Sequence, residues 1–302
     1  MKKFRLAAAA LCVALAAAGC GKQNSAPVTE TTLPQKAQTS VEIEYSNLAE
    51  PETQQELGQL MTLAGIQPGQ QENLFRHVDQ INDLLAPGEI TEGYEKGDSL
   101  FPKYDPYALQ EAWDQAHPDF IGYNCRITAF SLFHDFLTFP EAAAGSGDIL
   151  TFDLQALQAD SSAFPGLENQ FAAFYGNIPT AASADVNQQV MAVKQEWERR
   201  GIAFTDNPDV RLISVFSQDL LDPQNPTLFV THTGLLFPIN PQEFFFLEKL
   251  SFQEPYQCVR FDSRRQLNDY LMGKYDLDFN QPNAAAFIME NDALMEDYRV
   301  LS

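Results

Sequence analysis

The chain has 302 residues, of which 41 are acidic and 19 are basic, and its formal net charge is −22. An acidic excess of this size disfavours binding to nucleic acid or to an anionic lipid surface through charge. The aromatic content, which includes 23 phenylalanines, is sufficient to build one large hydrophobic core.

The N-terminus is predicted to be a signal peptide over residues 1–19. Three basic residues precede an apolar run over residues 6–18, which is too short to span a bilayer. The sequence AAGC at 17–20 resembles the lipobox of bacterial lipoproteins, although Ala17 stands where that box most often has leucine. The resemblance implies lipidation of Cys20 after cleavage. Cleavage of an ordinary signal peptide nearby is the alternative.

The segment after the signal peptide is predicted to be a tether. Residues 21–40 have no apolar periodicity and are rich in Ser, Thr, Gln and Pro, a composition typical of disorder. Residues 20–40 are therefore interpreted as a lipidated cysteine and a disordered tether, and residues 41–302 as a single domain. The protein is expected to be exported and held on the extracytoplasmic side of a membrane by the lipid on Cys20.

The pattern of apolar residues changes along the domain. Helical spacing predicts helices over 52–66, 71–85, 106–116, 152–160 and 185–201, and one that starts at Cys125. From about residue 210 the segments VRLISVF, TLFVTHTGLLF, EFFFLEKLSF and CVRF are typical of strands, and residues 263–273 of a last helix. A helical first half packed on a C-terminal antiparallel sheet defines an α+β fold.

Cys125 is the first candidate for chemistry. Asn124 is a favourable N-cap, which places Cys125 in the first helical turn, where the helix dipole and free N–H groups stabilise a thiolate. In that role Asn124 or backbone N–H groups would stabilise an oxyanion. Outside the cytoplasm Cys125 can also pair with Cys258. A nucleophile, a disulfide and a buried thiol all remain open at this stage.

A nucleophilic thiol needs a base, which is usually a histidine. His134 lies half a turn away from Cys125 on the same helix and cannot serve it. His77 is expected to be solvated and His117 to lie in a turn. His232 is left as the candidate base.

The strand that carries His232 is expected to present one face to Cys125. Gly234 is its neighbour on that face, and a strand glycine often marks a close approach of another segment. We expect the start of the Cys125 helix to approach there. A satisfied core histidine is the alternative. Alternation assigns to this face Leu228, Val230, His232, Gly234 and Leu236.

Glu248 is the candidate partner that orients the imidazole. If the turn between the two strands is centred on Asn240, Glu248 lies directly opposite His232, with Cβ atoms about 5 Å apart. A slip of one residue would place Leu247 or Lys249 there instead, and Glu248 would then be a solvated edge-strand charge. The sequence therefore predicts a catalytic triad of Cys125, His232 and Glu248.

This order of residues resembles the papain-like cysteine hydrolases, nearest to the branch that includes the NlpC/P60 cell-wall peptidases. The segment HTGLLF is similar to the histidine strand of that branch. The glutamate is an unusual third member, and no clear oxyanion-hole glutamine precedes Cys125. The resemblance implies a papain-like arrangement of the helical half and the sheet.

A second resemblance covers more of the chain. The segments YSNL at 45–48, NCRITAF at 124–130, HTG at 232–234 and FLEKLSFQEPYQ at 246–257 are similar to the bacterial lipoprotein family called domain of unknown function 4300. The similarity spans roughly residues 41–272. It implies that these motifs belong to one domain, and it implies no activity.

No zinc, calcium or phosphate-binding motif is visible, so neither a metal nor a cofactor is expected. The expected function is that of an envelope-anchored cysteine hydrolase that cleaves an amide or peptide bond, with peptidoglycan-related peptides as candidate substrates. The alternative is a non-catalytic lipoprotein that binds a peptide or cell-wall component in the same cleft. A structural envelope protein fits the composition equally well.

Overall fold

The computed structural model describes residues 38–141, 148–240, 242–277 and 283–301. The predicted signal peptide, Cys20 and most of the predicted tether lie outside the described residues. Helices and an antiparallel sheet make up the described part of the chain, as expected for an α+β fold. Among the described residues, no helix combines the length and the apolar character needed to cross a bilayer.

The predicted helices are found within a few residues of their expected bounds. They are α1 (Pro51–Leu63), α2 (Pro68–Asn82), α3 (Pro106–Ala116), α4 (Cys125–Phe133), α5 (Thr151–Ala159), α7 (Val186–Arg199) and α8 (Arg264–Tyr275). Helix α6 (Glu168–Tyr175) was not predicted.

The main sheet runs in the order β11-β10-β6-β7-β8-β9-β1-β2, and all of its pairs are antiparallel. The four predicted strands are β6 (Arg211–Asp219), β7 (Thr227–Pro238), β8 (Phe244–Lys249) and β9 (Tyr256–Phe261). The strands that were not predicted are β1 (Glu42–Ser46), β2 (Glu95–Asp98), β4 (Ile178–Pro179), β10 (Phe287–Glu290) and β11 (Ala293–Leu294), together with the separate pair β3 (Leu137–Thr138) and β5 (Ala203–Phe204).

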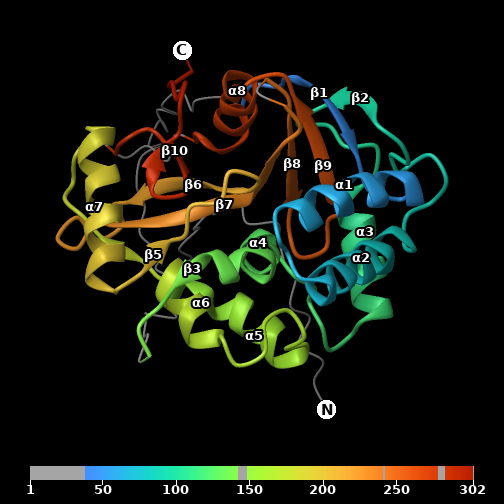
Figure 1. Cartoon of the computed structure of the whole chain (residues 1–302), viewed down its shortest axis with the longest axis horizontal. Coiled ribbons are helices and arrows are strands. Elements are labelled where there is room, and N and C mark those ends of the chain that lie inside the picture. The colour runs from blue at the N-terminus through green and yellow to red at the C-terminus, as the bar shows by residue number, and fades with distance from the viewer. Residues whose placement is uncertain (1–37, 142–147, 241, 278–282, 302) are drawn as a thin grey trace, which may run out of the picture.

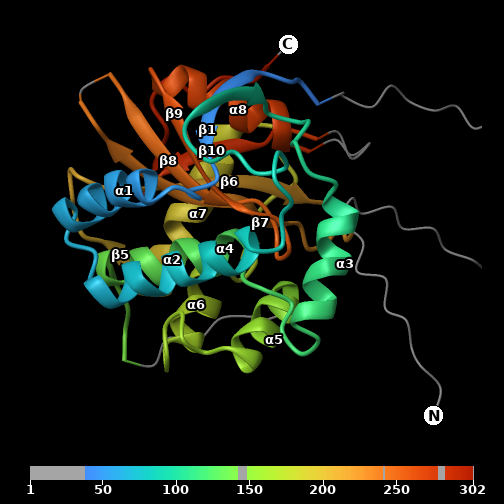
Figure 2. The same cartoon turned by 90° about the vertical axis from the view of Figure 1, so that its right-hand side faces the viewer.

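Helices cover both faces of the sheet, as Figures 1 and 2 show. Helix α8 lies on one face, and helices α1, α2, α4, α5 and α6 lie on the other. The buried apolar residues accordingly form two clusters. The larger cluster includes Leu235 and Phe237 of β7 and packs under the helices of the first half. The smaller cluster includes Leu236 of β7 and packs against α8.

A bulge in β7 corrects the predicted strand face. Val215 of β6 pairs with His232, and the next residue, Phe216, pairs with Val230, so Thr231 is inserted between them. Because a bulge shifts the alternation by one residue, Leu228 and Val230 belong to the larger cluster, whereas Leu236 belongs to the smaller one. The prediction that all five residues share one face is therefore wrong. His232 and Gly234 share a face with Leu236.

Strands β7 and β8 separate beyond Gly234. The ladder between them runs from the Pro238–Phe244 pair to the Gly234–Glu248 pair and continues no further. On the same side of β7, the short strand β4 takes over only at Leu228. Helix α4 lies beside β7 in both views (Figures 1 and 2), and its first turn contacts β7 within this interruption. There the Arg126 guanidinium donates to the Val230 carbonyl at 3.2 Å.

Gly122 shows how closely the chain before α4 is held. Its φ is +90°, and a Cβ added at this position would lie 2.2 Å from the Phe252 carbonyl oxygen. Glycine therefore meets both the backbone conformation and the space available.

We expect Gly122→Ala to lower the free energy of unfolding by about 3 kcal/mol, because the methyl group would overlap the Phe252 carbonyl. Urea denaturation measures the change. Gly166→Ala is the matched control: its φ is +79° and open space surrounds the added Cβ, so it should cost only about 1 kcal/mol. Equal losses in the two variants would contradict the steric account.

Candidate active site

Helix α4 begins where the sequence predicted. The Asn124 side-chain oxygen accepts from the Ile127 N–H at 3.0 Å, which confirms the N-cap. The backbone N–H groups of Cys125 and Arg126 have no backbone acceptor within the described residues. Cys125 thus lies in the first turn beside two free donors, where a negative charge is stabilised.

Asp153 of α5 fixes this helix start and was missed by the sequence analysis. It is 1% exposed. Its carboxylate accepts from Arg126 Nε at 2.9 Å and Nη2 at 2.7 Å, and from the Asn124 amide at 2.8 Å. The Asn124 amide group is therefore engaged with Asp153, which favours the backbone N–H groups over Asn124 as oxyanion donors.

The structure brings Cys125, His232 and Glu248 together. The Cys125 thiol lies near enough to the His232 ring for the two groups to shift each other's pKa. His232 Nε2 donates to Glu248 Oε2 at 2.5 Å. Since Nε2 is engaged with the carboxylate, Nδ1 is the ring nitrogen left for the thiol. All three residues are buried, with exposed fractions of 6%, 1% and 1% respectively.

The predicted register between β7 and β8 is wrong by two residues, but the predicted contact forms. Glu248 pairs with Gly234 instead of His232. The turn is longer than predicted because the Asn240 side chain accepts from the N–H groups of Gln242 and Glu243, which produces a five-residue loop. A shift of two residues keeps Glu248 on the same face, and a diagonal neighbour is within reach of long side chains.

The reason proposed for Gly234 is also wrong. A Cβ at this position would lie 2.6 Å from both the Leu247 carbonyl oxygen and the Phe246 ring. Strand β8 therefore makes the close approach, and not the start of α4. Gly234 supports the site indirectly, because it lets β8 lie near enough for Glu248 to reach His232.

Glu248 occupies a central strand and not a solvated edge. Its Oε2 accepts from His232, and its Oε1 accepts from Gln257 Nε2 at 2.5 Å and from the Tyr270 hydroxyl. Sequence reasoning missed both Gln257 and Tyr270. Three donors around one buried carboxylate satisfy its charge and hold it in a fixed orientation.

The charges of the triad support one another. Burial opposes the ionised forms, but the Glu248 carboxylate and the thiol raise the pKa of His232 to about 9. Burial alone would raise the pKa of Glu248, but the positive charge of His232 lowers it to about 2. Burial also opposes the Cys125 thiolate, but the hydrogen bond from His232 and its charge lower the pKa of that thiol. The arrangement favours a thiolate–imidazolium pair.

The second cysteine, Cys258, differs from Cys125 in the pKa of its thiol. Both cysteines are free and buried, so the structure does not contain the Cys125–Cys258 disulfide. Burial raises the pKa of the Cys258 thiol to about 12, which keeps it protonated and unreactive. Of the two thiols, only Cys125 has a pKa below its ordinary value, because His232 outweighs the effect of burial there.

The remaining histidines lie outside the triad. The prediction that His77 is solvated is wrong: it is 3% exposed, because it lies on the buried face of α2 with Leu74, Val78 and Ile81. Burial lowers the pKa of His77 to about 4. His117 ends α3 as its C-cap.

Lys249 is a second buried charge next to the triad. Its ammonium donates to the carbonyls of Ser251 at 2.8 Å, Phe252 at 3.2 Å and Glu254. The Phe252 carbonyl is the group that contacts Gly122, three residues before Cys125. Burial lowers the pKa of Lys249 to about 7. Lys249 therefore holds the segment against which the entry to α4 rests.

Of two hollows on the described surface, one adjoins the triad. This triad-side cavity has a volume of about 260 Å³. Gln257, Lys274 and Tyr275 line it and also belong to the surroundings of the triad. Tyr275 stacks on His232 with ring centroids 4.5 Å apart and an interplanar angle of 10°. Other lining residues include Ile43, Tyr45, Asp98, Ser99, Tyr104, Leu250 and Glu254.

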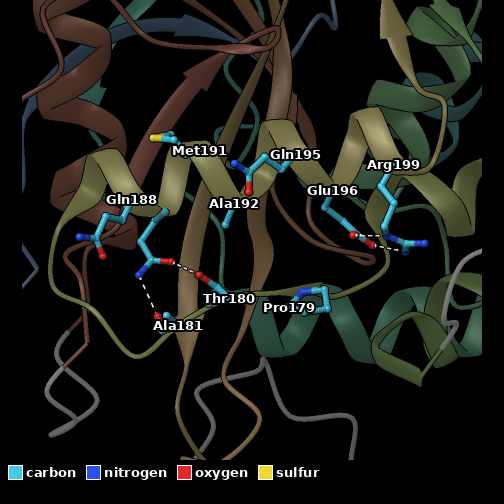
Figure 3. Close-up of a pocket in the computed structure, with 10 residues that line it drawn as sticks. Pro179, Thr180, Ala181, Gln188, Met191, Ala192, Gln195, Glu196 and Arg199 are labelled. Atoms are coloured by element: carbon cyan, nitrogen blue, oxygen red, sulfur yellow. Dashed lines mark hydrogen bonds and ion pairs between the residues drawn. The ribbon is translucent and has the colours of Figure 1, made fainter.

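The other hollow, of about 480 Å³, lies between β4 and α7 (Figure 3). Gln189 holds its wall through hydrogen bonds with Thr180 and Ala181, and Glu196 pairs with Arg199. None of its described hydrogen bonds involves the triad. No group of three or more His, Cys, Asp or Glu side chains among the described residues is arranged to hold a metal ion.

A comparison with models of known protein families identifies the family of this chain. The family model described as a domain of unknown function, number 4300, matches residues 44–295, and the chain belongs to this family. No curated protein and no solved structure matched the chain.

We expect Glu248→Gln to lower the pKa of His232 from about 9 to below its ordinary value of 6.5, because burial then acts without the carboxylate charge. A titration of the imidazole by NMR measures this. Glu243→Gln, an exposed glutamate at the start of the same strand, is the control and should leave the His232 pKa unchanged.

The same substitution should lower the free energy of unfolding by about 3 kcal/mol at neutral pH, since it leaves a buried imidazole without its partner. The raised pKa of His232 stabilises the fold fully below pH 6.5, and this contribution is lost as the pH rises through about 9. The lowered pKa of Glu248 stabilises it above pH 4.5, and that contribution is lost as the pH falls through about 2. A loss in Glu248→Gln equal to that in Glu243→Gln would contradict this account.

Proposed function

We propose that the protein is a cysteine hydrolase that cleaves an amide or peptide bond with the triad Cys125, His232 and Glu248. The observation that carries the proposal is a thiol at a helix start beside an imidazole that is itself bonded to a buried carboxylate. A cysteine at a helix tip, a histidine on a strand and a carboxylate on the neighbouring strand support a papain-like arrangement by analogy.

In the proposed mechanism the Cys125 thiolate attacks the carbonyl carbon and forms a C–S bond. The backbone N–H groups at the start of α4 stabilise the oxyanion. The C–N bond then breaks while the His232 imidazolium gives its proton to the leaving amine. A water molecule then attacks the thioester while His232 accepts its proton. The C–S bond breaks, which releases the carboxylic acid and restores the thiolate–imidazolium pair. Glu248 holds the imidazole in orientation throughout and is not consumed.

The proposed location follows from the leader sequence. The basic start, the short apolar run and the AAGC sequence support export and lipidation of Cys20. The enzyme would then face the extracytoplasmic side of a membrane, where peptidoglycan stem peptides and other envelope amides are available as substrates. This substrate class rests on location and on fold analogy.

A second candidate function is that of a non-catalytic envelope lipoprotein that binds a peptide or cell-wall component. The observation in its favour is that Cys125 and His232 are almost fully buried and Tyr275 covers the imidazole, whereas the adjoining cavity is open. In this reading the triad would only stiffen the wall of the cavity.

Thiol labelling separates the two candidates. At neutral pH we expect a small thiol reagent to label Cys125 at least about tenfold faster than Cys258, because only the Cys125 thiol has a lowered pKa. Mass spectrometry of peptides from the labelled chain gives the two rates. His232→Ala should remove the preference, and His117→Ala is the matched control. Equal and slow labelling of both thiols would favour the binding function.

The pH dependence gives an independent test. We expect the labelling rate of Cys125 to rise as the pH passes the lowered pKa of its thiol and to change again near pH 9, where His232 loses its proton. Hydrolysis should fall above about pH 9, since the leaving amine then receives no proton. His232→Ala should shift the rise in labelling toward the ordinary pKa of a thiol. An unshifted profile would contradict the ion pair.

A further inference from the structure

Two opposite charges face the triad-side cavity without pairing with each other. Glu254 and Lys274 both line it, and no ion pair joins them among the described residues. Each is anchored by a tyrosine. Glu254 Oε2 accepts from the Tyr104 hydroxyl at 2.8 Å, and Lys274 Nζ donates to the Tyr270 hydroxyl at 3.0 Å. Within the described part of the chain, no hydrogen bond is formed by Glu254 Oε1 or by the other two N–H groups of the Lys274 ammonium.

Fixed charges of opposite sign across a small cavity suit a ligand that carries a donor and an acceptor at matching positions. The cavity volume of about 260 Å³ is below the range of about 300–1,000 Å³ usual for sites of drug-sized ligands. It is therefore suited to one terminal group of a longer ligand.

The lining favours a positive group over a negative one. The side chains of Asp98 and Glu254 bring two carboxylates against the single ammonium of Lys274. The rings of Tyr45 and Tyr104 also line the cavity, and aromatic rings attract cations, whereas the Tyr275 ring already contacts His232 and Lys274. The net charge of the chain, −22, attracts cationic ligands as well.

The position of the cavity relates it to the reaction. Tyr275 forms its wall on one side and stacks on His232 on the other. Gln257 lines the cavity and donates to the Glu248 carboxylate. Tyr275 and Gln257 therefore connect the cavity to the imidazole and to the carboxylate of the triad.

We propose that the triad-side cavity binds the N-terminal residue of a peptide substrate, with its α-ammonium on Glu254 and its first carbonyl oxygen on Lys274. The inference rests on the proposed hydrolase function and narrows the substrate class to peptides with a free N-terminus that are cut near that end. Blocking the ammonium removes both a charge and its hydrogen bond to Glu254.

Binding is tested with the full domain carrying Cys125→Ala, which cannot turn over the probe. Alanyl-alanine amide and its N-acetyl counterpart are titrated by calorimetry. We expect the acetylated peptide to bind at least about tenfold more weakly, as a charge-assisted hydrogen bond is lost. Glu254→Gln should reduce that preference to near unity while keeping an acceptor for Tyr104. Glu111→Gln, an exposed glutamate of α3, is the matched control.

Lys274→Met tests the second contact. It should weaken binding of the free and the acetylated peptide by a similar factor, because both retain the first carbonyl oxygen. Lys194→Met, an exposed lysine of α7, should leave both affinities unchanged. Equal affinity of the unaltered cavity for the two peptides, or binding of neither, would overturn the proposal.

Hydrolysis of the same peptides by the chain with Cys125 intact separates this inference from the function on which it rests. Preferential binding of the free N-terminus without cleavage of either peptide supports the cavity and counts against the hydrolase. Cleavage of both peptides with equal kcat/KM supports the hydrolase and overturns the cavity assignment. Cleavage of the free peptide at least about tenfold faster supports both.

Discussion

The separation of β7 from β8 beyond Gly234 is the constraint on which the site depends. A strand that loses its neighbour exposes backbone groups that need other partners when they are buried. Arg126 satisfies one of them at the Val230 carbonyl, and Asp153 fixes the Arg126 guanidinium in turn. These contacts hold the start of α4 at the interruption in the ladder between β7 and β8. Because Cys125 precedes Arg126, the interaction that completes β7 also brings the thiol to His232.

The second constraint is the cost of burying charged side chains. Strand β8 carries one such side chain on each face. Glu248 points to the side of α8, where Tyr270 donates to it, and Lys249 points to the opposite side, where three carbonyls accept from it. Burial of an ion costs several kcal/mol unless its hydrogen bonds are complete. Apolar residues of similar size would stabilise such a strand as well or better. Two adjacent buried charges next to a thiol of lowered pKa are therefore more typical of a functional site than of a core.

The local parts of the site could be predicted from sequence because they depend on short-range rules. Asn124 is a good cap, and a cap fixes which residue begins the helix. The contact between His232 and Glu248 survived a register error because the error was an even number of residues, and strand faces repeat every two residues. The helix bounds followed from apolar spacing in the same way.

The missed parts depend on the tertiary structure. The bulge at Thr231 could not be predicted from the sequence pattern, since β7 contributes apolar residues to both hydrophobic clusters. Asp153, Tyr270 and Tyr275 reach the site from helices far away in the sequence, and no local pattern identifies which side of those helices they occupy. The loop after Pro238 was misjudged because the Asn240 side chain, and not a tight turn, organises it.

The site has two parts, which are the triad and the cavity beside it. Cys125, His232 and Glu248 all lie in the segments that resemble the family. Asn47, which follows β1, also lies in one of these segments. Its side chain donates to the Tyr256 carbonyl at 3.1 Å and accepts from the Thr91 N–H at 3.0 Å. These segments therefore supply all three residues of the triad.

Most residues of the cavity walls lie outside the four segments that resemble the family. Tyr104 precedes α3, and Lys274 and Tyr275 end α8, whereas Glu254 alone supplies a charge from within the FLEKLSFQEPYQ segment. A catalytic group tolerates little change, because the reacting atoms must meet at fixed distances. A binding wall built from separate loops and helix ends can change without moving those atoms. The triad and most of the cavity walls are thus built by different parts of the chain, and Tyr275 belongs to both surroundings.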